Sequence, residues 1–167
     1  MDSVHSALEE YIDLLRPLNV GTFSKINVSD KNNLTPLTFL QSKINEAFEW
    51  CIINKQELFS TPQHIHDLIY KKLELEHHEE WQMILRNDLL IWATNWDGAV
   101  QNDDLFNRIQ NLINAIKRTY GNAIHFYRIK DEMRTEDIHV FWGYLDFLDY
   151  IIETDSELVH LHLDCSD

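Results

Sequence analysis

The sequence predicts an all-α or mostly α fold, a bundle of five to six helices that forms a single domain over residues 1–167. Three observations favour this fold class. Apolar residues recur at steps of three and four along most of the chain, as they do on the buried face of a helix. Only 4 Gly and 3 Pro occur, so few residues interrupt regular elements. The hydrophobic fraction of 44% is enough for a packed core.

The first predicted helix covers residues 3–15. Its apolar residues, Val4, Leu8 and Tyr11 among them, share one face, and Pro17 ends it because proline cannot continue a helix. The polar segment that follows is predicted to be a loop of about fifteen residues, in which 23–28 could form a short strand.

Two later helices begin with the same dipeptide. Thr35 and Thr61 are candidate N-caps, and Pro36 and Pro62 follow them at the first helical position, where the missing N–H costs nothing. These starts predict a helix from residue 36 onward and another over 62–78.

The rest of the chain is predicted to add three helices and a small ribbon. Helices are expected over 79–96, 103–119 and 136–153 from their apolar periodicity. Segment 123–130 is ambiguous between a strand and a helical turn. Segment 157–165 alternates at period two, so it could pair with 123–130 as a two-stranded β appendage to the bundle.

Charge and composition narrow the classes of partner. The net charge of −14 disfavours nucleic acid and membrane surfaces and favours a basic protein. No apolar run is long enough to span a bilayer. The two cysteines, Cys51 and Cys165, form no framework, so a cytoplasmic location is expected.

The stretch "LELEHHEEW" (73–81) contains two adjacent histidines among four glutamates, which are residue types that bind metal ions. The spacing Glu-x-x-His, which di-metal helical bundles use, occurs at Glu74–His77 and again at Glu136–His139. Helical geometry places these four side chains away from the predicted apolar faces. The interpretation is therefore a solvated helix face, with no metal and no cofactor, and a metal-dependent bundle enzyme remains the alternative.

An acidic stripe near the C-terminus is the feature that points to a function. After Arg134 the sequence has nine acids and neither Lys nor Arg. On a helix, acids at steps of three and four would repel one another and oppose the helix dipole, so a function is suspected where no base offsets them. The candidate partner-binding residues are Asp146, Asp149, Glu153, Asp155, Glu157 and Tyr150.

The functional prediction follows from this stripe and from the lack of catalytic motifs. The chain is expected to be a small acidic binding protein, not an enzyme, which neutralises or docks onto a basic protein. An immunity protein or antitoxin that inhibits a toxin such as a nuclease is the favoured example. The alternatives are the metal-dependent enzyme above and a structural or adaptor domain that self-associates, for instance as a homodimer.

Overall fold

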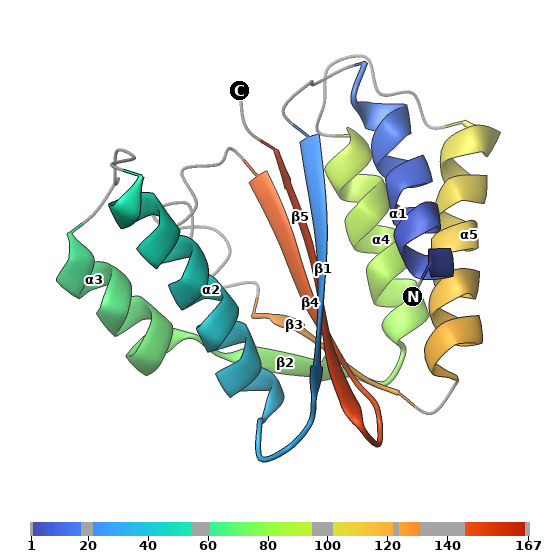
Figure 1. Ribbon diagram of the computed structural model, residues 1–167. Coiled ribbons are helices and arrows are strands. Elements are labelled where there is room, and N and C mark those ends of the chain that lie inside the picture. The colour runs from blue at the N-terminus through green and yellow to red at the C-terminus, as the bar shows by residue number, and fades with distance from the viewer. Residues whose placement is uncertain are drawn as a thin grey trace.

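The chain folds around one antiparallel β-sheet with helices on both faces (Figure 1). The computed structural model describes residues 2–17, 22–54, 61–94, 102–121, 124–130 and 146–165. The predicted all-α bundle is therefore wrong, and the fold is α+β. Segments 123–130 and 157–165 do contain strands, but they belong to a five-stranded sheet and another strand separates them.

Helices and strands are interspersed along the chain. In order, the elements are α1 (Asp2–Leu15), β1 (Thr22–Asp30), α2 (Pro36–Ile53), α3 (Pro62–Asp67), the π-helix η1 (Leu68–Lys72), β2 (Leu75–His78), α4 (Trp81–Thr94), α5 (Asp103–Tyr120), β3 (His125–Ile129), β4 (Asp146–Glu153) and β5 (Glu157–Cys165).

The sheet has the strand order β1-β5-β4-β3-β2 and divides the interior into two cores. Helices α1, α4 and α5 cover one face, and α2 and α3 cover the other (Figure 1). Successive residues of a strand point to opposite faces of the sheet and therefore enter different cores. For example, Leu148 joins the α1/α4/α5 core, and Ile151 joins the α2/α3 core.

The predicted helix 136–153 is corrected by this arrangement. Its second half is strand β4, and residues 136–145 lie outside the described residues. Because helices cover both faces of the sheet, the consecutive residues Tyr150, Ile151 and Ile152 are all buried. Such a continuous apolar run cannot be distinguished from a buried helix by periodicity.

The predicted helix 62–78 is also too long. The helical part ends at Lys72, and the chain then forms β2, which pairs with β3. Segment 123–130, which was ambiguous, contains this partner strand. Both predicted threonine caps are confirmed, because the side chains of Thr35 and Thr61 accept hydrogen bonds from the amides of Thr38 and His64.

Candidate functional site

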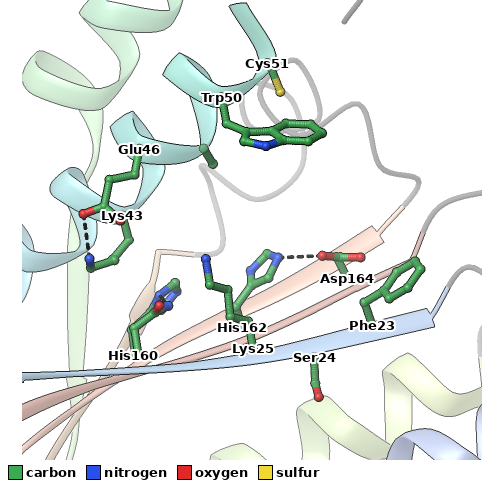
Figure 2. Close-up of a pocket in the computed structure, with 12 residues that line it drawn as sticks. Phe23, Ser24, Lys25, Lys43, Glu46, Trp50, Cys51, His160, His162 and Asp164 are labelled. Carbon is green, nitrogen blue, oxygen red and sulfur yellow. Dashed lines mark hydrogen bonds and ion pairs between the residues drawn. The ribbon is translucent and has the colours of Figure 1, made fainter. Parts of the chain in front are cut away.

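A cavity of about 430 Å³ lies between α2 and the strands β1 and β5. Figure 2 shows Trp50 reaching over it from α2, and Lys25, His162 and Asp164 on the strands below. The remaining lining residues are Phe23, Ser24, Asn27, Lys43, Glu46, Ala47, Cys51 and His160. Polar groups thus line the floor of the cavity, while aromatic side chains stand at its edge.

Two histidines and two carboxyl groups form a buried chain of hydrogen bonds at the floor. Asp149 Oδ1 accepts from His160 Nε2 at 2.6 Å and from His162 Nδ1 at 2.8 Å. His162 Nε2 donates to Asp164 Oδ2 at 2.8 Å. All four side chains are buried. Among the described residues, Asp149 Oδ2 has no hydrogen-bond partner.

The charges within this cluster stabilise one another. Burial alone would raise the pKa of Asp149, but the positive charge of His162 and hydrogen bonds from both histidines hold that pKa well below its usual range. Burial alone would lower the pKa of His162, yet the adjacent carboxylates of Asp149 and Asp164 raise it to about 9. His162 is accordingly an imidazolium that donates from both ring nitrogens.

Strand geometry brings these groups together. Residues at steps of two point to the same face of a strand, so His160, His162 and Asp164 all face α2 from β5. Asp149 of β4 lies directly opposite His162 in the antiparallel register. The period-two pattern of "HLHLD" was the available signal for the three β5 residues. Asp149 was missed because its strand was predicted to be a helix.

The predicted acidic stripe is not a single surface in the structure. Asp149 and Tyr150 are buried on opposite faces of the sheet. Glu153 is largely buried and forms an ion pair with Lys31. Asp155 is exposed and Glu157 is half-buried at the turn between β4 and β5. Asp146 starts β4, opposite Cys165 at the other end of the strand pair.

The residues of the alternative metal site are likewise not arranged as in a helical bundle. Glu74 precedes β2 and its side chain pairs with Lys130, while His77 lies on β2 and contacts His125 at 3.3 Å between ring nitrogens. Glu136 and His139 lie outside the described residues. With β2 in place of a helix, the three-residue spacing of Glu74 and His77 puts their side chains on opposite sides of the strand.

A second polar network lies on the other face of the sheet. Arg128 Nη1 donates to both carboxylate oxygens of Asp88, at 2.9 and 3.2 Å, and the Tyr150 hydroxyl donates to Asp88 Oδ2 at 3.0 Å. These bonds join α4 to β3 and β4. Because the groups satisfy one another in a region with little solvent access, the network holds α4 on the sheet.

Comparisons with known proteins identify no family for this chain. No family model matches it, and no curated protein matches it. Two crystal structures of citrus MAF1 are distantly similar. In space group P 31 2 1 the TM-score is 0.44 at 12% identity, over 96% of this chain and 98% of that chain. In space group C 2 2 21 the TM-score is 0.43 at 12% identity, over 96% and 99%.

Within the described ranges, no helix combines the length and the apolar character that a bilayer-spanning segment needs.

Proposed function

We propose that the protein is a binding protein that docks onto a basic protein partner and blocks it, as immunity proteins and antitoxins do with toxins such as nucleases. The observation that carries this proposal is an exposed apolar patch at the mouth of the cavity, on a chain of net charge −14. Trp50 is 58% exposed and Phe23 is 54% exposed, and both line the cavity.

These side chains have the chemistry of an interface anchor. Tryptophan and phenylalanine are enriched in protein interfaces, and truncation of a central tryptophan often removes a large part of the binding energy. Trp50 and Phe23 both border the cavity, which offers room for a side chain of the partner. Trp50 and Phe23 together are called the anchor patch below.

The acidic charge contributes mainly at long range. The cavity wall itself is mixed, because Lys25 and Asp164 both line it and Lys43 is paired with Glu46 at 2.6 Å. The excess of acids over the whole surface would accelerate the approach of a basic partner. An arginine or lysine of that partner could then compete with Lys43 for the carboxylate of Glu46. The proposal places the complex in the cytoplasm, where the free thiol of Cys51 would stay reduced.

The test is quantitative capture of partners from the natural source by tagged protein. The wild type is compared with the double variant Trp50→Ala/Phe23→Ala and with Ile91→Ala, which truncates an exposed side chain on α4 at the far face of the molecule. We expect wild type and Ile91→Ala to retain the same basic protein, which high salt releases. We expect the double variant to bind it at least about 30-fold more weakly, as for loss of a hot spot.

Two further arms separate the alternatives. Asp155→Asn changes the exposed acid that remains from the predicted stripe, at the opposite end of β5 from the anchor patch. Loss of the partner in that variant, but not in the anchor-patch variant, would move the docking site to the β4–β5 turn. Recovery of untagged copies of the chain would support self-association. Equal capture by wild type and the double variant would refute the anchor patch.

A further inference from the structure

The cluster of Asp149, His160 and His162 contains the donor set of a metal centre. One oxygen of Asp149 and one nitrogen of each histidine lie within 4.8 Å of one another, and the three residues are buried. Among the described residues, this is the group with three such ligands in reach of a single ion. The three donors come from two adjacent strands, so the sheet fixes their positions.

One carboxylate oxygen of the cluster lacks a partner. The side chain of Asp149 is fully buried, yet its Oδ2 has no hydrogen-bond partner among the described residues. A buried carboxylate oxygen without a partner costs free energy. A cation bound by both oxygens of the carboxylate, together with the imidazoles, would give Oδ2 the partner that it lacks.

The groups around the cluster match the outer shell of a metal site. A histidine that binds a metal through one nitrogen usually donates from the other to a carboxylate or an amide oxygen. His162 Nε2 already bonds Asp164, which leaves Nδ1 as the ligand atom. His160 Nδ1 lies 3.1 Å from the side-chain amide of Asn27, and rotation of that amide by half a turn presents its oxygen to the ring.

We infer that Asp149, His160 and His162 bind a zinc ion whose fourth coordination position opens into the cavity under α2. Two histidines and a carboxylate are a donor set that zinc accepts, and catalytic zinc sites leave one position for water or another ligand. His160 and His162 line the cavity, so the open position faces it. Zinc would displace the Nδ1 proton of the His162 imidazolium, which is released to solvent, and one dication with two neutral imidazoles would then balance the carboxylates of Asp149 and Asp164.

The geometry requires only a small adjustment. Zinc ligands at about 2.0–2.2 Å in a tetrahedron are about 3.3 Å from one another. Asp149 Oδ1 is now 2.6 and 2.8 Å from the two histidine nitrogens. Each imidazole would therefore withdraw from the carboxylate by less than about 1 Å, as a metal ion replaces the hydrogen-bonded protons. The three ligands do not belong to the anchor patch, so the inference does not rest on the proposed partner, although the open position of the zinc and a side chain of the partner would share the cavity.

The test uses purified protein from which any histidine tag has been removed. After removal of metal with a chelator, Zn²⁺ is titrated into the wild type, and Co²⁺ serves as a spectroscopic probe. We expect one zinc per chain, a higher unfolding temperature, and the visible absorption of tetrahedral cobalt. In Asp149→Asn and His162→Gln, we expect affinity to fall by more than about 100-fold, because even outer-shell partners contribute 10–100-fold.

The matched control is His77→Gln/His125→Gln. These two exposed histidines lie 3.3 Å apart at the edge of the sheet, so they report adventitious binding at the surface. This variant should keep the zinc site. If the buried variants do not fold, Asn27→Ala, which changes a partly exposed residue, should weaken zinc about 10-fold. A wild type without the cobalt spectrum, or a loss of zinc only in the control, would overturn the inference.

Discussion

The carboxylate of Glu153 lies between two donors, Lys31 directly after β1 and Tyr127 on β3. Lys31 Nζ lies 2.5 Å from Oε1, and the Tyr127 hydroxyl donates to Oε2 at 2.8 Å. Burial would raise the pKa of Glu153, but these two partners outweigh it and lower the pKa below its ordinary value. Burial and the adjacent carboxylate raise the pKa of Tyr127 to about 12. At neutral pH Glu153 is therefore an ionised carboxylate and Tyr127 keeps its hydroxyl proton, as the hydrogen bond between them requires.

The lowered pKa of Glu153 predicts a loss of stability in acid. A group whose folded pKa is depressed stabilises the fold above its unfolded pKa, and this contribution disappears as the pH falls through the folded value. At pH 7, Glu153→Gln should lower the free energy of unfolding by about 1–2 kcal/mol, because a charge-assisted hydrogen bond is lost. In acid, once the pH has fallen below this lowered pKa, Glu153 becomes protonated and the difference from wild type should shrink. Urea unfolding at both pH values measures it.

A surface pair provides the comparison for Glu153. Glu46 pairs with Lys43 at 2.6 Å, but 57% of the Glu46 side chain is exposed. Exposed ion pairs contribute little, so Glu46→Gln should change stability by less than about 0.5 kcal/mol at either pH. A Glu153→Gln effect that is the same at pH 7 and in acid would show that the charge is not what stabilises this pair.

At the scale of the element, α2 depends on a cap that the sequence made visible. The Thr35 side chain accepts from the Thr38 amide at 3.1 Å, and the Thr38 hydroxyl accepts from the Thr35 amide at 2.9 Å. Pro36 follows at the first helical position. Two amides at the helix start are therefore satisfied by side chains, as in a capping box.

Thr35→Ala should lower the free energy of unfolding by about 1 kcal/mol, the usual cost of losing an N-cap. Thr94→Ala is the control, because Thr94 ends α4 and, among the described residues, its hydroxyl donates to the carbonyls of Leu90 and Ile91 in the preceding turn. That change should cost less than about 0.5 kcal/mol. Chemical denaturation measures the free energy of unfolding of both variants. Equal losses in the two variants would mean that the cap does not stabilise α2.

The burial pattern of each element explains which elements could be predicted. Helices α1 and α5 each bury one face, so their apolar residues recur with the helical period and both were predicted. Strand β5 was anticipated from its alternation. Strand β4 was not, because Leu148 and Ile151 enter different cores and residues 148–152 are buried on both faces of the strand. A strand buried on both sides has lost the signal that distinguishes it from a helix.

The candidate site could be predicted only in part for a related reason. His160, His162 and Asp164 share one strand face and are visible as a spacing of two. Their common partner Asp149 is 11 residues from His160 and 13 from His162 in sequence. Only the register of β4 against β5 brings it beside them. The cavity has no sequence signal of its own, because its walls come from the three separate elements β1, α2 and β5.

At the scale of the whole molecule, the balance of charge opposes the compact state. With 28 acidic and 14 basic residues, the folded chain concentrates like charges that the unfolded chain spreads apart. The described ion pairs offset part of this repulsion, for example Arg16 with Glu9 and Lys71 with Asp67. Exposed pairs of this kind contribute at most about 1 kcal/mol each, and salt screens them as it screens the repulsion.

The sign of the salt dependence therefore reveals which effect dominates. We expect repulsion to dominate, because acids outnumber bases two to one. Raising sodium chloride from about 0.01 to 0.3 M should then shift the unfolding temperature upward by a few degrees, which corresponds to about 1 kcal/mol for a chain of this size. Thermal unfolding at several salt concentrations measures the shift, and choline chloride should give the same curve if screening, not a specific cation, is the cause. A fall in the unfolding temperature would mean that the ion pairs outweigh the net charge.

The long-range attraction invoked for a basic partner would not be affected by that result, since it depends on the charge facing solvent and not on the stability of the fold.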